Sequence, residues 1–449
     1  MDSTESVGPC WSLADTMQSL LDKRVRNGLL RSIALPTQLI LDQHRTMVDF
    51  SSNDYMGLSH NTNLSYQINQ ILINNNNLIQ SQSTSASQQL PQVARIGSTG
   101  SRLLAGNSVD AVSLENMLVS HYTSKSTNDV ASSNFKSPYK ALLFNSGYDA
   151  NLSLFSAIPQ SNVLVLYDEL IHASVHDGLR LRRFGKIKSF KHNDIINVKN
   201  ILDAFFTEEA LDTDMSNRCA VIAVEAVYSM DGDVAPLLEL AKISKMYKGK
   251  VNLIIDEAHS TGVIGERGAG LVHDLDIEDT VFARLHTFGK GMGSHGAVVI
   301  GSSTLIEFLV NFGRPLIYST MMSFHSLVEI RTSHKFVATH WKSLQDTLKA
   351  KIVLFRNLMH SMPPGAQLLG SMTAIQGIVL PGNENVNTLA HILLSCGQSV
   401  RPIRFPTVPK GSERVRICIH VHNTDKEIKA LSQDCLAALK LVLSKPAKL

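Results

Sequence analysis

The sequence has few cysteines, little net charge and no long apolar run. Its five cysteines are scattered over 449 residues without a Cys-x-x-Cys pair, so neither a disulfide framework nor a zinc site is expected. The formal net charge of +3 gives no reason to expect binding to nucleic acid or to an anionic membrane. No apolar segment approaches the roughly 20 residues that span a bilayer. The composition is that of a globular protein, and 449 residues are enough for one large core and a smaller appended domain.

The ends of the sequence bear on targeting. Ala447-Lys448-Leu449 is close to the Ser-Lys-Leu signal for peroxisomal import, and Pro446 would end the preceding helix and leave this tail free. The first residues include Asp2 and Glu5 and no early arginine, which is not typical of a transit or signal peptide. We therefore expect a peroxisomal protein, and otherwise a cytoplasmic one.

Two polar segments interrupt the first third of the chain. Residues 73–92 and 124–138 are rich in Asn, Gln and Ser. Segments of this composition bury too little apolar surface to offset the entropy of ordering. Both are therefore predicted to be solvated surface loops.

Short apolar runs alternate with helix-length segments between residues 139 and 300. The runs are at 139–144, 162–167, 218–227, 250–256 and 297–300, with one further strand ending just before Lys290. Continuous apolar strands spaced by helices are typical of a mainly parallel α/β sheet that is covered on both faces.

The pattern changes after about residue 330. A long helical stretch is followed by a helix at 387–396, strands near 400–403 and 414–420, and a last helix that opens with the capping box Thr424-x-x-Glu427. We therefore predict three parts. They are an N-terminal helix and strand segment (1–60), a large domain (61–330) and a small C-terminal α/β domain (331–449).

A glycine-rich stretch, TFGKGMGSHGAVVIGS at 287–302, surrounds a single lysine, Lys290. Gly291-x-Gly293-x-x-Gly296 has the spacing of a dinucleotide-binding turn, but that turn must open a helix. Here an apolar, β-branched run follows at once and predicts another strand. The context therefore argues against a nucleotide, and Lys290 needs another explanation.

Polar residues follow each predicted strand, and ligands bind beyond the carboxyl ends of such strands. The sets that follow the strands are Asn145–Tyr148, Asp168–His172, Tyr228–Asp233, Asp256–His259 and Lys290. Each member alone has an ordinary explanation as a turn, cap or core residue. Their ordered occurrence at successive strand ends indicates one common site.

The chemistry that suits this set is that of pyridoxal phosphate. A desolvated Lys290 would be nucleophilic, and Asp256 could keep the cofactor's ring nitrogen protonated. Gly147 and Tyr148 stand at a predicted helix start, where free N–H groups favour a phosphate, and Thr287 could add a hydroxyl.

Ten ordered stretches of the sequence match a known family. They are DFSSNDYMGLS, IGSTGSRLLAGN, FNSGYDAN, DELIHASVHDG, FKHND, VEAVYSMDGDVAPL, IIDEAHSTGVIGERGAG, TFGKGMGSHGA, RPLIYST and IRFPTVPKGSERVRI. Over about residues 15 to 440 the chain resembles the α-oxoamine synthases, which are fold-type-I pyridoxal phosphate enzymes. The resemblance implies a mainly parallel seven-stranded sheet sandwiched by helices. One departure is Thr99, where a glycine is common, in a region that the family uses near the acyl substrate.

The resemblance also implies roles at the cofactor. Lys290 would hold the cofactor and serve as acid and base, Asp256 would pair with the ring nitrogen, and His172 would stack on the ring. The remaining cofactor-binding residues would be His259 at the ring hydroxyl, Ser229, Thr287, and Gly147 and Tyr148 at the phosphate.

Further residues would bind substrates or the partner subunit's cofactor. Asn53 and Arg404 are similar to residues that hold the amino-acid carboxylate, and Arg31 and Thr407 match substrate-side positions. Ser319 and Thr320 resemble residues that reach the phosphate of a partner subunit, which implies a homodimer.

The reaction implied is the decarboxylative condensation of an amino acid with an acyl-CoA, with L-alanine and pimeloyl-CoA as the expected pair. Relatives of the same family use glycine or serine with other thioesters, as 5-aminolevulinate synthase, 2-amino-3-ketobutyrate CoA ligase and serine palmitoyltransferase do. A different class of function is a non-catalytic partner subunit of this fold. Such a subunit would be expected to lack the lysine, which argues against it here.

Overall fold

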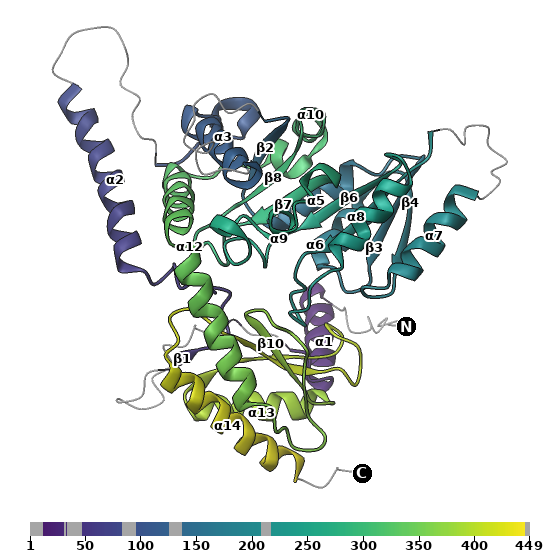
Figure 1. Cartoon of the computed structure of the whole chain (residues 1–449), viewed down its shortest axis with the longest axis vertical. Helices are drawn as coiled ribbons and strands as arrows, with labels where there is room; N and C mark the ends of the chain where they lie inside the picture. The colour runs from purple at the N-terminus through teal and green to yellow at the C-terminus, as the bar shows by residue number, and fades with distance from the viewer. Residues whose placement is uncertain are drawn as a thin grey trace, which may run out of the picture.

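The computed structural model describes residues 12–30, 33, 47–82, 96–124, 137–207 and 217–444. Figure 1 shows a large α/β domain and a smaller domain near the C-terminus, with the long helix α12 (Phe324–Leu358) running from one to the other. Arg31 and the tail at 445–449, which carries the targeting expectation, lie outside the described residues. Within those ranges, no helix combines the length and apolar character that a bilayer span requires.

A seven-stranded sheet forms the centre of the large domain. In spatial order its strands are β2 (Tyr139–Phe144), β8 (Ala297–Ser302), β7 (Val281–Thr287), β6 (Val251–Asp256), β5 (Cys219–Glu225), β3 (Val163–Asp168) and β4 (Lys186–Phe190). β8 is antiparallel to both of its neighbours, and the other pairs are parallel. The predicted mainly parallel seven-stranded sheet is confirmed, and each predicted apolar run overlaps a strand.

The edge strand β4 was not anticipated from the sequence. Four of its five residues are exposed, and Lys186 and Lys188 interrupt any apolar run. Charged side chains on an edge strand oppose pairing with a further chain, so this position suits a polar strand.

Helices cover both faces of the sheet because its strands are apolar on both sides. In β3, Val163 and Val165 belong to one buried cluster, whereas Leu164 and Leu166 belong to another. This alternation is the two-residue period of a strand. The first cluster includes side chains of α5 (Gly147–Ala157), α6 (Ala173–Leu181), α10 (Ser303–Phe312) and α11 (Arg314–Tyr318). The second includes side chains of α7 (Ile195–Thr207), α8 (Leu237–Met246) and α9 (Leu271–Asp274).

The small domain combines chain segments from both ends of the sequence. An antiparallel sheet has the order β12 (Arg401–Ile403), β13 (Arg414–Cys418), β10 (Ile375–Val379) and β9 (Gln367–Leu368). β1 (Val48–Asp49) pairs with β11 (Gln398–Ser399), and α13 (Asn383–Ser395) and α14 (Asp425–Leu443) complete the domain. The capping box that starts α14 at Thr424 is confirmed.

One polar segment differs from its prediction. Helix α2 (Thr62–Gln82) extends through residues 73–82, which the sequence was expected to leave as a loop. Asn is only moderately unfavourable in a helix, and a helix already nucleated at Thr62 can propagate through such residues. The loop prediction is wrong for 73–82, while residues 83–92 lie outside the described ranges, as do 125–136 of the second polar segment.

Candidate active site

The polar residues that follow neighbouring strands meet at one edge of the sheet. β5 ends at Glu225 and β6 ends at Asp256, and these two residues are register partners in a parallel pair. β7 ends at Thr287, shortly before Lys290. The charges of Asp256 and Glu225 both act on Lys290. The structure therefore brings the predicted lysine and the predicted aspartate together.

Lys290 lies in a turn whose close packing requires glycine. The N–H of Gly293 donates to the Lys290 carbonyl oxygen at 2.9 Å. Gly293 and Gly296 have φ angles of 56° and 113°, in the left-handed region that favours glycine. A Cβ on Gly291 would come within 2.7 Å of the Thr261 carbonyl oxygen. The glycines thus serve the fold of the turn around the lysine.

Burial shifts the pKa values of Lys290 and Glu225 in opposite directions. It lowers the pKa of the half-buried Lys290, although Asp256 and Glu225 oppose the shift. A lowered pKa leaves more of the amine neutral, which is its nucleophilic and basic form. Burial, together with the charge of Asp256, raises the pKa of Glu225 to about 8. Glu225 is therefore largely a neutral acid at pH 7.

Asp256 is held as a fixed hydrogen-bond acceptor. One carboxylate oxygen accepts the backbone N–H of Ala258 at 2.9 Å, and the other accepts Asn151 Nδ2 from α5 at 2.8 Å. Asp256 is only 8% exposed. These bonds fix the direction of a carboxylate that is nearly removed from solvent.

A hydrogen-bond chain continues from Asn151 to His172. Because Asn151 Nδ2 also donates to Ser174 Oγ at 3.0 Å, the Ser174 hydroxyl is free to donate to His172 Nδ1, at 2.8 Å. The Ser174 backbone N–H donates to the same nitrogen at 3.2 Å. His172 therefore carries its proton on Nε2. His172 is exposed as a residue, but its ring is partly desolvated, and this desolvation lowers the pKa of His172. The negative charge of Asp256 acts in the opposite direction and raises it.

A second network joins His259 to the small domain. His259 Nδ1 lies 2.7 Å from the hydroxyl of Tyr55, and Tyr55 donates to Asn53 Oδ1 at 2.9 Å. Arg416 of β13 donates to Asn53 Oδ1 at 2.9 Å and to the Tyr55 hydroxyl at 3.2 Å. Burial, and then the positive charges of Lys290 and Arg416, hold the pKa of His259 well below its usual value. His259 is thus a neutral hydrogen-bonding group.

Gly147 brings the start of α5 against Thr287. A Cβ on Gly147 would lie 2.4 Å from Thr287 Oγ1, so only glycine allows this approach. Ser146 caps the helix by accepting the Asp149 N–H at 3.1 Å. The first N–H groups of a helix have no acceptor within the helix and favour an anion. Gly147, Tyr148 and Thr287 therefore lie together, as the phosphate prediction requires.

Other predicted residues are placed around this centre in different ways. Ser229 is buried, and its N–H donates to Glu225 Oε2 at 3.2 Å, which places it in the site. Thr320 is exposed, and its carbonyl oxygen accepts Asn145 Nδ2 at 2.8 Å. Ser319 is half-buried beside it. These two residues lie at the rim of the same sheet edge.

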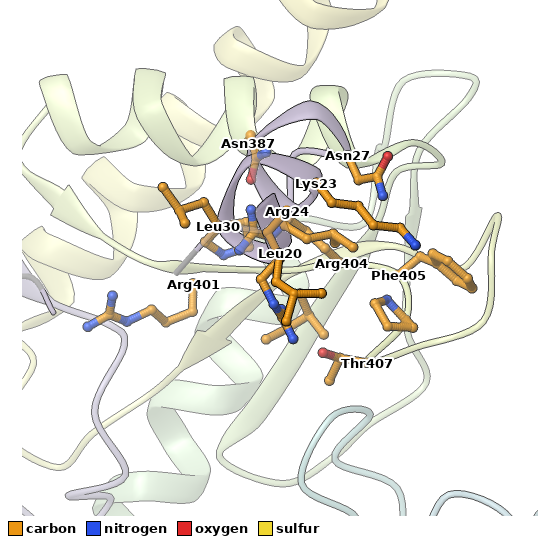
Figure 2. Close-up of a pocket in the computed structure, with 14 residues that line it drawn as sticks. Leu20, Lys23, Arg24, Asn27, Leu30, Asn387, Arg401, Arg404, Phe405 and Thr407 are labelled. Atoms are coloured by element: carbon orange, nitrogen blue, oxygen red, sulfur yellow. The ribbon is translucent and has the colours of Figure 1, made fainter. Parts of the chain in front are cut away.

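Arg404 and Thr407 are not joined to Asn53. The Arg404 guanidinium donates to the Gly28 carbonyl oxygen at 2.7 Å. Both residues line a separate pocket of about 920 Å³ next to α1 (Leu13–Arg26), shown in Figure 2. In the structure Arg416, and not Arg404, contacts Asn53, so the carboxylate role of Arg404 stays a prediction. Arg404 lies one residue beyond the end of β12, and its side chain turns toward α1 and away from Asn53.

Sequence reasoning missed five residues that build the site. They are Tyr55, Asn151, Ser174, Glu225 and Arg416. A charged residue inside an apolar strand was an available signal for two of them, since Glu225 lies inside the run at 218–227 and Arg416 lies inside the strand near 414–420. The other three carry no charge and are ordinary in loops and helices.

Pyridoxal phosphate, the group expected from the sequence, fits the residues present. The site offers an amine of lowered pKa, a buried carboxylate at fixed orientation and a glycine cradle that a Cβ would fill. Arg416 is only 7% exposed, and its Nε has no hydrogen-bond partner within the described ranges. A buried guanidinium with unused donors suits a ligand carboxylate.

Comparisons with known proteins agree with this chemistry. The family model "Aminotransferase class I and II" matches residues 45–433. The chain is 38% identical over 409 residues to an 8-amino-7-oxononanoate synthase from Emericella nidulans, covering 90% of this chain and 92% of that protein. It is 34% identical over 313 residues to the aminoacyl transferase sphA of Aspergillus fumigatus, covering 65% of this chain and 66% of that protein.

A solved structure shares the fold over nearly the whole chain. A serine palmitoyltransferase from S. paucimobilis with a bound PLP-myriocin aldimine superposes with a TM-score of 0.76. The match covers 97% of this chain and 100% of that chain at 22% sequence identity. At that identity the likeness bears on the fold alone.

Proposed function

Because the chain belongs to the class I and II aminotransferase family, and within it to the pyridoxal-phosphate-dependent α-oxoamine synthases, we propose that it condenses L-alanine with pimeloyl-CoA. The products are 8-amino-7-oxononanoate, CoA and CO₂. The observation that carries this proposal is Lys290, an amine of lowered pKa beside Asp256 and Glu225. It occurs in a chain that is 38% identical to an 8-amino-7-oxononanoate synthase.

Lys290 has two tasks in the proposed reaction. Bound pyridoxal phosphate supplies an electron sink, which takes up electrons when the Cα proton leaves and again when CO₂ leaves. Lys290 Nζ holds the cofactor until the amino acid arrives and then accepts the Cα proton of alanine. The lowered pKa suits both tasks, because each needs a neutral amine.

Fixed hydrogen bonds orient the groups that act with Lys290. Asp256 Oδ1 and Oδ2 are held by Ala258 and Asn151, so the carboxylate needs no reorganisation when it pairs with a protonated nitrogen. His172 presents an Nε2–H, since Ser174 occupies its Nδ1. Arg416 and Asn53 lie together and would hold the alanine carboxylate.

A second candidate is another condensation of the same family. The similarity to the aminoacyl transferase sphA keeps another amino acid, such as glycine or serine, with a different acyl-CoA, as the alternative. A non-catalytic subunit is disfavoured because Lys290, Asp256 and His259 are all present and placed around one site.

The proposal also includes a homodimer. The family resemblance assigns Ser319 and Thr320 to a partner subunit's cofactor, and both lie at an accessible rim. The exposed apolar side chains of α1 include Leu13 at 72% and Met17 at 55%, which a second copy could cover. Sedimentation velocity at micromolar concentration is expected to give a dimer. A fully active monomer would contradict this part of the proposal.

The substrate assignment is tested by CoA release. Purified holoenzyme is incubated with alanine, glycine or serine and with pimeloyl-CoA, succinyl-CoA or palmitoyl-CoA, and free thiol is measured. We expect the highest kcat/KM for alanine with pimeloyl-CoA, and no measurable release by Lys290→Ala. A preference for another pair would assign the chain to a different reaction of the family. No release with any pair would favour the non-catalytic subunit.

A further inference from the structure

Glu225 is a buried carboxylate to which the proposed reaction gives no role. It ends β5 and is only 3% exposed. Its Oε2 accepts the backbone N–H of Ser229 at 3.2 Å, whereas its Oε1 has no hydrogen-bond partner within the described ranges. A buried charge with so few donors is costly, and protonation removes that cost. The surroundings of Glu225 therefore decide whether it carries a proton.

Glu225 projects on the face of the sheet that carries the active site. Val221 and Ala223 of β5 belong to the buried cluster that includes side chains of α5 and α6, and Glu225 follows them on the same two-residue period. Ile254 places Asp256 of β6 on the same face by the same argument. The two carboxylates are register partners on adjacent strands, which lie roughly 5 Å apart. They therefore share one side of the sheet.

Hydrogen-bond donors distinguish the two carboxylates. Asp256 accepts N–H groups on both oxygens, from Ala258 and from Asn151. Glu225 accepts one such group, from Ser229. Donors stabilise the ionised form of a carboxylate. When negative charge accumulates on this face, Glu225 is therefore the carboxylate that is easier to protonate.

Positive groups of the amino-acid site lie within range of the Glu225 charge. That charge acts on Lys290, on Arg416 and on the Tyr55 hydroxyl. Within the described ranges, the charged or titratable groups that interact with Glu225 from the surrounding elements are Asp168 of β3, Asp256 of β6, Lys290 after β7, Arg416 of β13, Tyr55 and Tyr228. The cations favour the ionised form of Glu225, and the two aspartates favour its neutral form.

A bound amino acid changes this balance. Its carboxylate would neutralise Arg416, which is only 7% exposed and whose Nε has no hydrogen-bond partner within the described ranges. It would also add negative charge near Asp256 and Glu225, in a buried region where like charges repel strongly. Both effects favour the neutral form of Glu225.

We propose that ionised Glu225 takes up a proton when the amino-acid carboxylate binds to Arg416 and Asn53. The inference rests on the proposed function, because that function supplies the amino acid. The proton comes from solvent and forms an O–H bond on Oε1, the oxygen without a partner. No electrons are transferred, and the charge of the proton balances that of the incoming carboxylate. Glu225 is thus a positioning residue of the amino-acid site, since it acts through its charge.

The proposal gives carboxylate binding a defined pH dependence. Burial, and then the charge of Asp256, raises the pKa of Glu225 to about 8. Well below pH 8 Glu225 is already neutral, so binding takes up no proton and the affinity is full. As pH rises through 8, binding requires a proton from solvent, and the affinity falls. A carboxylate that binds only the neutral form loses about tenfold in affinity between pH 7 and pH 9.

Propionate tests the proposal without turnover. It has the carboxylate of alanine but no amino group, so it cannot displace the cofactor from Lys290, and it stays ionised above about pH 6. Its dissociation constant is measured from the cofactor absorption of the holoenzyme at pH 7 and pH 9. Glu225→Gln keeps the size of the side chain and removes its proton. The matched control Glu307→Gln removes an exposed carboxylate from α10.

We expect the dissociation constant of the wild type and of Glu307→Gln to rise about tenfold from pH 7 to pH 9, and that of Glu225→Gln to change less than about twofold. At pH 9, Glu225→Gln should therefore bind propionate more tightly than the wild type, a gain that a damaged site would not produce. The cofactor and Lys290 are the same in all three proteins, so their own titrations do not create this difference. Equal pH dependence in Glu225→Gln and the wild type overturns the proposal.

Calorimetry counts the proton directly. Propionate is titrated into the wild-type holoenzyme at pH 8 in two buffers that differ in ionisation enthalpy and contain no primary amine. We expect uptake of about half a proton per propionate, because Glu225 is about half ionised at that pH. Uptake of less than about a tenth of a proton overturns the proposal, even where Glu225→Gln does not load the cofactor. If the proton is taken up as expected but no pair of substrates releases CoA, the proposed reaction fails while the role of Glu225 stands.

Discussion

A buried glutamate and a buried aspartate lie side by side at the ends of β5 and β6. Glu225 is 3% exposed, and its Oε1 has no partner in the described ranges. Burial, and then the charge of Asp256, raises the pKa of Glu225 to about 8. Asp256 accepts two hydrogen bonds from N–H groups, an arrangement that suits an anion, whereas Glu225 Oε1 accepts none within the described ranges.

Replacing Asp256 by Asn tests the role of that anion. An amide keeps the size of the side chain but cannot stabilise a protonated ring nitrogen. We expect kcat to fall by about 10², which corresponds to roughly 3 kcal/mol, with little change in melting temperature. The rate of CoA release and a thermal melt provide the two readouts. An unchanged kcat would mean that another residue carries the role.

Two arginines can be compared at the amino-acid carboxylate. Arg416→Lys removes a bidentate fork from the group that contacts Asn53, whereas Arg404→Lys changes the α1 pocket. We expect Arg416→Lys to raise the KM for alanine about tenfold, and Arg404→Lys to affect mainly the KM for the thioester. The opposite pattern would return the carboxylate site to Arg404.

At the scale of elements, strand ends are tied together by side chains from the loops that follow them. His192, two residues after β4, donates through Nδ1 to Asp168 at 2.8 Å and through Nε2 to Asp233 at 2.7 Å. Asp168 ends β3, and Asp233 lies in the loop after β5. Burial disfavours the charge of His192, but the two carboxylates outweigh it and raise its pKa to about 9. One imidazolium thus links three strand ends beside the active site.

The His192 link predicts a loss of stability at alkaline pH. Its folded pKa of about 9 lies above the usual 6.5, so its contribution is complete below about pH 6.5 and is lost as pH rises through 9. Because the group is partly exposed, we expect about 1–2 kcal/mol. Urea unfolding at pH 7 and pH 10 measures it. His192→Gln should be less stable at pH 7 and should lose less on going to pH 10; an equal loss in both proteins would contradict the assignment.

At the scale of the whole molecule, one helix ties the two domains together. The first half of α12 packs against the large domain through a buried set of rings from different elements: His121 of α3 (Val109–Thr123), His286 of β7 and His334 of α12. The Tyr122 hydroxyl lies 2.8 Å from His334 Nε2, and its ring stacks on His286 at 3.8 Å between centroids. Burial holds the pKa of His121 and of His286 well below the usual value and lowers that of His334 to about 4.

This set predicts acid lability of the folded chain. The unfolded histidines protonate near pH 6.5 and the folded ones do not, so stability falls as pH drops from about 6.5 toward 4. His334 alone accounts for about 3 kcal/mol at pH 4. His334→Gln should flatten the decline measured by urea unfolding between pH 7 and pH 5, whereas His391→Gln, at an exposed site on α13, should not. Equal slopes for the two variants would argue against the buried histidines.

The sequence by itself determined the alternation of strands and helices, because short apolar runs between helix-length segments are typical of buried strands. It also indicated Lys290, Asp256 and Gly147 as residues of one site. The first two are ionisable residues at strand ends, and Gly147 lies where a side chain would clash with Thr287. The polar edge strand β4 and the helix at 73–82 were not predicted, because neither segment has a periodic apolar pattern.

Only the tertiary structure decided which arginine contacts Asn53. Arg404 and Arg416 are equally basic in sequence, but β12 and β13 run antiparallel, so the chain turns between them. That turn carries Arg404 toward α1 and Arg416 toward Tyr55, more than 300 residues away in the chain. The same holds for Asn151 and Ser174, which acquire a role only because α5 and α6 begin at the same sheet edge. Contacts of this kind depend on how strands are ordered and directed in the sheet, which local sequence does not encode.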